Sequence, residues 1–201
     1  DVSTLAGMVQ FIDELKLSRM HYVMDRGFYS QKGIESLLKK RIKFAIGVPF
    51  TASIAKDTVR ECVEEITSPS NAIQVNGQII YAKTKMVKLN NRRVYVHVYF
   101  DEERHASERT VFMQKLLKLE EALRCGQISK DDQFVQKYFI IRNTKNGLHI
   151  KRNEEAIHKK TELNGYFVIL TNDSKDPKYI LELYRTKDIV EMTFNNLKND
   201  L

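Results

Sequence analysis

The sequence predicts an α/β fold, and three features of its hydrophobic pattern support this prediction. Residues 3–48 follow the order helix, strand, helix, strand, which is the order expected of an α/β sheet. Residues 73–100 alternate apolar and polar side chains around Asn-Gly and Asn-Asn, a pattern typical of antiparallel strands joined by short turns. A strongly apolar segment at 164–173 returns to the strand pattern near the end of the chain. We therefore expect both ends of the chain to contribute to one α/β core.

The first quarter of the chain predicts two helix–strand pairs. Residues 3–17 place apolar side chains at helical spacing after Ser3, a residue type that caps helices. A short strand at 22–24 ends at Asp25 and is followed by a turn. Residues 31–41 predict a helix with basic residues in its last turn, where the helix dipole favours them. The apolar run FAIGV at 44–48 suits a strand that is covered on both faces.

The middle of the chain predicts a separate subdomain. We expect a helix at 52–66, then strands at 73–89 and 92–100, and a long charged helix at 102–124. Residues 127–160 are polar and basic, with one clear strand at 138–142, and the rest of that segment stays unassigned. A closing helix begins near Pro177. The predicted core is therefore 1–50 together with 163–201, interrupted by a β-rich insertion at 51–162 that contains the long helix.

The composition of the chain favours an anionic partner. The 201 residues carry a net charge of +7, which points to nucleic acid first and an acidic membrane second. Cys62 and Cys125 have no zinc-ligand spacing and no disulfide framework, so we expect reduced thiols. The histidines are scattered without metal spacing, and we expect them to be structural or on the surface. No apolar run approaches the ~18 residues needed to span a bilayer.

The closing helix carries polar residues along one stripe. Relative to Tyr184, Lys187, Glu191 and Lys198 fall at about −60°, −20° and −40° around an ideal helix. An adjacent apolar arc is suited to docking the helix on the core. It consists of Leu183, Val190, Phe194, Leu197 and Leu201. The helix is therefore expected to hold a hydroxyl, a carboxylate and two ammonium groups at the edge of an interface.

Asp25 and Glu191 form a candidate pair of metal ligands. Polar residues just past the carboxyl ends of strands line the ligand crevice of open α/β sheets, and Asp25 has that position. Mg²⁺ prefers oxygen ligands and takes few carboxylates, so Asp25 and Glu191 suit it. Tyr184, Lys187 and Lys198 beside them are suited to phosphate. From the residues alone, a capping aspartate and a solvated helix face explain the same pattern more simply.

These residues resemble a known family, the bacterial DDE transposases of the insertion-sequence four superfamily. Their signature is Tyr, two residues, Arg, three residues, Glu, six residues, Lys, and the stripe of the closing helix matches it at every step. Lys187 stands where the family usually has Arg, which keeps the charge and loses a bidentate fork. The segment DRGFYS (25–30) resembles the one that holds the second catalytic aspartate, here Asp25. GYFVILTND (165–173) resembles the strand and Thr-Asn turn that precede the signature helix.

The resemblance implies an RNase H-like mixed sheet flanked by helices, with its first strands upstream of residue 1. It implies that Asp25, Glu191 and an upstream aspartate bind two Mg²⁺ or Mn²⁺ ions, so we expect this chain to be an incomplete fragment. Tyr184, Lys187 and Lys198 would then hold DNA phosphates, and Arg26 is a further DNA-contact candidate or an exposed turn residue. The implied partners are transposon ends, target DNA and a second copy in a synaptic dimer. We expect no membrane association and a cytoplasmic, nucleoid-associated protein.

Two other functions remain open from the sequence. The chain could be a nucleic-acid-binding module without chemistry, such as a domesticated relative, whose DNA affinity would not depend on Asp25 or Glu191. It could also be a protein-interaction or structural domain that is basic by accident and binds no DNA at moderate salt. The spacing in the closing helix favours the transposase.

Overall fold

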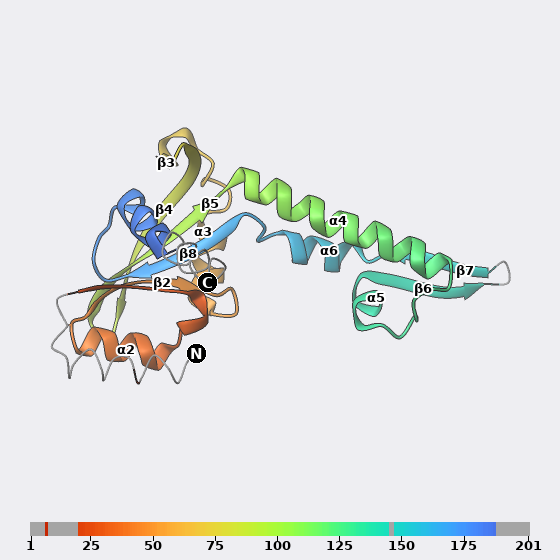
Figure 1. Ribbon diagram of the computed structural model, residues 1–201, viewed down its shortest axis with the longest axis horizontal. Helices are drawn as coiled ribbons and strands as arrows, with labels where there is room; N and C mark the ends of the chain where they lie inside the picture. Colours follow the sequence, from red (N-terminus) through yellow and green to blue (C-terminus); the bar gives the residue numbers. More distant parts are fainter. Residues whose placement is uncertain (1–6, 8–19, 145–146, 188–201) are drawn as a thin grey trace, which may run out of the picture. The chain divides into compact units, whose positions relative to one another are not determined.

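The computed structural model describes residue 7 and residues 20–144 and 147–187, and the structural statements below concern those residues (Figure 1). The chain forms two compact units. The first unit comprises the chain up to Phe100 and from Phe167 onward, and the second comprises Asp101–Tyr166. The predicted α/β class is confirmed, because a mixed sheet flanked by helices makes up the first unit.

The first unit is built on a six-stranded sheet with the strand order β1-β2-β8-β5-β4-β3. β1 and β2 are parallel, whereas β2–β8, β4–β5 and β3–β4 are antiparallel. A helical segment at 177–187 follows β8. The elements are β1 (His21–Met24), η1 (Arg26–Phe28), α2 (Gln31–Lys39), β2 (Lys43–Val48), α3 (Ser53–Cys62), η2 (Pro69–Asn71), β3 (Ala72–Val75), β4 (Gln78–Leu89), β5 (Arg92–Phe100) and β8 (Tyr166–Thr171).

The β1–α2–β2 unit forms as the sequence predicts. Ser30 caps α2 by accepting a 3.1 Å hydrogen bond from the backbone N–H of Gly33. The helix buries Ile34, Leu37 and Leu38, which recur at helical spacing along one face. β2 is almost entirely buried after its first residue, as expected of a strand with neighbours on both sides.

Side chains of the segment after β8 fasten its end to the start of β2. The Thr171 hydroxyl donates to the carbonyl of Phe44 at 2.6 Å. The Asn172 amide donates to the carbonyl of Ile42 at 2.9 Å and accepts from the N–H of Phe44 at 3.0 Å. Asp173 pairs with Lys43 at 2.7 Å, and this contact raises the pKa of the lysine. The Thr-Asn turn noted in the sequence therefore anchors β8 and sets where the closing helix begins.

The structure divides the chain at positions other than those predicted. Strands β3, β4 and β5, which we had assigned to the insertion, belong to the six-stranded sheet. The physical reason is a shared core, in which Tyr99 and Ile80 pack with Ala45 and Ile169. Alternating apolar residues predict a strand but do not identify the sheet that it joins. The segment between the two parts of the first unit is Asp101–Tyr166.

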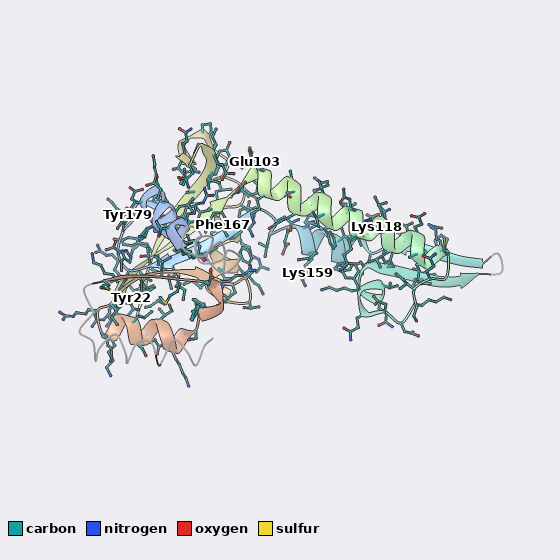
Figure 2. All side chains as sticks on the ribbon, viewed as in Figure 1. Tyr22, Glu103, Lys118, Lys159, Phe167 and Tyr179 are labelled. Atoms are coloured by element: carbon teal, nitrogen blue, oxygen red, sulfur yellow. The ribbon has the colours of Figure 1, made fainter. Side chains whose placement is uncertain are left out.

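The second unit is organised by its long helix α4. Asp101 caps this helix by accepting from the N–H of Arg104 at 2.9 Å, and Figure 2 shows Glu103 and Lys118 along it. Its buried residues Leu116 and Leu123 pack in a core with Val135, Tyr138, Phe139 and Ile150. Glu120 binds Arg124 at 2.9 Å and Arg152 at 2.8 Å. The elements are α4 (Glu102–Arg124), α5 (Gln133–Tyr138), β6 (Phe139–Thr144), β7 (Gly147–Arg152) and α6 (Glu154–Thr161).

None of the helices in the described ranges combines the length and apolarity that crossing a membrane requires.

The expectation that the histidines include structural ones is met by His97, which is fully buried in β5. Its Nε2 lies 3.0 Å from the carbonyl of Ser174, and its Nδ1 lies 2.8 Å from the Thr84 hydroxyl. Because a carbonyl can only accept, Nε2 carries the proton and Nδ1 accepts from Thr84.

We predict that His97 makes the stability of the protein depend on pH. Burial lowers the pKa of His97 to about 4, so the folded state disfavours its charged form. The stabilisation is complete above the unfolded pKa of about 6.5 and is lost as pH falls toward 4, by roughly 2–3 kcal/mol. Urea unfolding at pH 7 and pH 4.5 should show a smaller loss for His97→Gln than for the unsubstituted chain. His149→Gln, at an exposed position, is the control and should leave the loss unchanged.

Candidate functional site

Asp25 lies at the carboxyl end of β1, where the neighbouring strand β2 also ends. The two strands are parallel, with Met24 opposite Ile46. The backbone of Asp25 begins η1, and its carbonyl accepts from the N–H of Phe28 at 3.0 Å. Its side chain makes no capping hydrogen bond. The simpler explanation of Asp25 as a helix cap therefore does not hold, and its carboxylate is turned to other partners.

The helical segment 177–187 brings two of the predicted site residues to Asp25. The segment is fixed on the sheet by Ile180 and Leu181, which are fully buried. Three and six residues after Leu181, Tyr184 and Lys187 therefore face the carboxyl end of β1. The Tyr184 hydroxyl donates to Oδ1 of Asp25 at 3.3 Å, and the Lys187 ammonium forms an ion pair with the same oxygen. The Lys187 Nζ also lies 4.7 Å from the centroid of the Tyr184 ring.

The stability gained from this cluster is small. The side chain of Asp25 is 44% exposed and that of Lys187 is 19% exposed. An ion pair with so much solvent access contributes no more than about 1 kcal/mol. The contacts from described residues meet at Oδ1, and Oδ2 accepts none of them. The arrangement thus presents a carboxylate oxygen to solvent beside a hydroxyl and an ammonium donor, which is a suitable set of groups for a cation and a phosphate.

The other predicted site residues divide into two groups. Arg26 is exposed at the start of η1, directly after Asp25. Glu191 and Lys198 lie outside the described residues. The structure therefore brings together Asp25, Tyr184 and Lys187, the last two of which are 159 and 162 residues from Asp25 in the sequence.

Gly47 is a residue of the site that the sequence interpretation missed. A Cβ atom at this position in β2 would lie 2.6 Å from the Tyr184 hydroxyl oxygen and 3.1 Å from the backbone N of Arg26. Glycine is thus needed for close approach of the closing helix to the sheet. The available signal was the single glycine in the apolar run FAIGV, because an isolated glycine in a strand often marks such an approach.

Asp25 is the described residue of this cluster whose chemistry would suit a metal ion. Within the ranges that the structure describes, no group of three or more His, Cys, Asp or Glu side chains converges. Asp25 nevertheless has the right chemistry, since Mg²⁺ is commonly held by one or two carboxylates together with water and substrate phosphates.

We predict that Gly47→Ala destabilises the site through the Tyr184 hydroxyl. The added methyl group occupies the space of that oxygen, so we expect the hydrogen bond to Asp25 to break and the overpacking to cost about 1–3 kcal/mol. Tyr184→Phe removes the obstructing atom. Thermal unfolding of both single variants and the double variant should therefore show that Gly47→Ala costs clearly less when it is combined with Tyr184→Phe. Strictly additive losses would show that the methyl group and the hydroxyl do not compete for space.

The comparisons with known proteins identify the family. The family described as "Transposase DDE domain" matches residues 1–201. No curated protein and no solved structure matches the chain. The sheet flanked by helices is consistent with the RNase H-like fold of such domains. The chain therefore belongs to the family of transposase DDE domains, DNA-binding phosphoryl transferases that act in DNA transposition and generally use divalent metal ions.

Proposed function

We propose that this chain belongs to the catalytic domain of a bacterial insertion-sequence transposase, of the insertion-sequence four superfamily. In this proposal Asp25 and Glu191 are two of the three catalytic carboxylates. The observation that supports it is the convergence of Asp25 with Tyr184 and Lys187. The closing helix delivers to Asp25 the two signature residues that fall within the described part of the chain.

Asp25 and Glu191 would hold two Mg²⁺ or Mn²⁺ ions together with a third catalytic carboxylate. When bound, such ions stabilise the attacking and leaving oxygens of an in-line displacement at phosphorus. Asp25 contributes a carboxylate fixed by its place at the end of β1. Its Oδ2, which accepts no hydrogen bond from the described residues, is the oxygen that is open to a cation.

Lys187 and Tyr184 have a second role in this proposal. In the structure the Lys187 ammonium neutralises Asp25. Once the carboxylate has another cation, this ammonium and the Tyr184 hydroxyl become donors to a DNA phosphate. Lysine acts there as a point charge, whereas the arginine usual in the family would bind two phosphate oxygens at once. Lys198 and Arg26 are proposed as further phosphate contacts, and sequence readout lies elsewhere because phosphate contacts do not specify bases.

The proposal extends to the organisation of the whole enzyme. The unit Asp101–Tyr166 is the insertion that such enzymes place between the second aspartate and the glutamate. The complete enzyme acts on transposon ends and target DNA as a synaptic homodimer in the bacterial nucleoid.

We predict that Asp25 is required for binding of Mn²⁺. In titrations followed by water-proton relaxation, Asp25→Asn should weaken Mn²⁺ affinity by about tenfold or more, because it removes a charged ligand. Glu61→Gln is the matched control, since Glu61 is another carboxylate of the first unit that is paired with a lysine, Lys85. Equal affinities for Asp25→Asn and Glu61→Gln would exclude the metal role. Retained DNA binding would then favour the non-catalytic nucleic-acid-binding module.

We predict a different effect for the proposed phosphate contacts. The variant Lys187→Ala with Lys198→Ala should raise the dissociation constant for duplex DNA and should lower the slope of log affinity against log salt by about 1.8, or ~0.9 per lost contact. Asp25→Asn should leave the affinity unchanged or increase it, because it removes a negative charge. Fluorescence anisotropy at several salt concentrations measures both. A salt slope that is unaffected by the lysine substitutions would contradict the assignment.

A further inference from the structure

The tip of the β4–β5 hairpin carries positive charge that the described residues do not neutralise. Residues 78–100 include five lysine and arginine residues and no acidic residue. Lys83 and Lys85, near the middle of β4, form ion pairs with Glu65 and Glu61. The remaining three lie at the tip and form no ion pair with the residues that the structure describes. They are Lys88, Arg92 and Arg93.

The hairpin holds these charges close together. Lys88 and Arg93 are directly opposite each other in the β4–β5 register. Like charges at opposed positions destabilise a sheet, so their placement is not explained by the stability of the hairpin. Asn90 and Asn91 form the turn with φ values of 49° and 59°. Two consecutive left-handed residues are typical of the tight type I′ turn, which gives a short, rigid hairpin end.

A groove lies between this tip and helix α2. Its volume is about 490 Å³. Asn90 and Arg92 line it from the hairpin, and Lys32 and Lys39 line it from α2. The one acidic side chain in the lining, Glu35, accepts a 3.4 Å hydrogen bond from Gln31. Three cations and one anion thus face the same space, together with the neutral donors Ser36 and Asn90.

The groove is separate from the Asp25 cluster. Asp25, Tyr184 and Lys187 do not line it. Lys32 and Lys39 are seven residues apart on α2, which corresponds to ~10 Å along a helix axis. Successive phosphates of one DNA strand lie about 3.4 Å apart along the duplex axis. The separation between Lys32 and Lys39 therefore spans about three phosphate steps. Amines, a guanidinium and neutral donors are the groups that commonly contact phosphodiester oxygens.

We propose that the groove between α2 and the β4–β5 tip binds the sugar–phosphate backbone of duplex DNA, as a contact surface additional to the Asp25 cluster. Lys32, Lys39 and Arg92 contact phosphates inside the groove, and Lys88 and Arg93 extend the surface on the other face of the hairpin. The inference rests on the proposed function in one respect, since it takes duplex DNA as the partner.

The test compares two variants that remove the same charge from the first unit. Arg92→Gln with Arg93→Gln removes two of the three positive charges at the tip. It should leave the fold intact, because it relieves the repulsion between Lys88 and Arg93. Lys56→Gln with Arg60→Gln is the control, because both residues are exposed on α3 and lie outside the groove. Affinity for a fluorescent duplex of about 30 base pairs is measured by anisotropy between about 50 and 200 mM salt, with thermal unfolding as the check on folding.

We expect the tip variant to bind at least about tenfold more weakly at about 100 mM salt, with a salt slope lowered by about 1.8. The control should change affinity by less than about twofold. If both variants bind the duplex equally well, the groove proposal is wrong while the proposed function stands. If the unsubstituted chain binds no duplex even at low salt, both fail. If the tip variant lost binding to anionic phospholipid vesicles but still bound duplex DNA, the surface would be assigned to a membrane and the proposal would be overturned.

Discussion

The antiparallel pairing of β2 with β8 is the interaction on which the first unit depends. It joins Ala45–Val48 to Val168–Thr171, two segments that lie far apart in the chain. The side chains of Thr171 and Asn172 add three hydrogen bonds to the β2 backbone and its approach. Because the closing helix starts only a few residues later, this pairing also decides where Tyr184 and Lys187 lie. The Asp25 cluster therefore forms because β2 and β8, which lie far apart in the sequence, pair in a fixed register.

The cluster at Asp25 contrasts with the other aspartates that begin helices. Asp101, Asp132 and Asp176 each accept a hydrogen bond from a backbone N–H of the turn that they introduce. Asp25 also precedes a helical turn, but its carboxylate points instead to Tyr184 and Lys187. A capping bond at Asp25 would be worth about 1 kcal/mol, and the exposed ion pair gains no more. Stability therefore does not explain why the Asp25 carboxylate contacts Tyr184 and Lys187 instead of capping η1. A site that needs hydrogen-bond donors beside this carboxylate does explain it.

Much of the fold and the site follows from local patterns in the sequence. Helix α4 begins and ends within the range predicted from its periodicity, and the spacing of the signature selected Tyr184 and Lys187. Other features depend on tertiary contacts that leave weak local signals. The strands at 72–100 have the alternation of any half-buried strand, and only their shared core with Ala45 and Ile169 assigns them to the main sheet. Gly47 is one residue in an apolar run, and its importance arises from the hydroxyl of Tyr184, far along the chain. Helix α5 has six residues, too few to establish a helical period.

The ion pairs of the first unit distinguish lysines with a structural role from a lysine that could become available to a ligand. Lys43, Lys83 and Lys85 each face a carboxylate that holds them along the sheet or against α3. Lys187 also faces a carboxylate, but among the described residues the other oxygen of Asp25 accepts no hydrogen bond. A metal ion there would weaken the hold of Asp25 on Lys187 and leave that ammonium for an incoming phosphate, because one carboxylate cannot neutralise both charges. In the proposed function, the ion pair would keep the carboxylate and its donors in position before metal and DNA bind, and replacing it would cost little free energy.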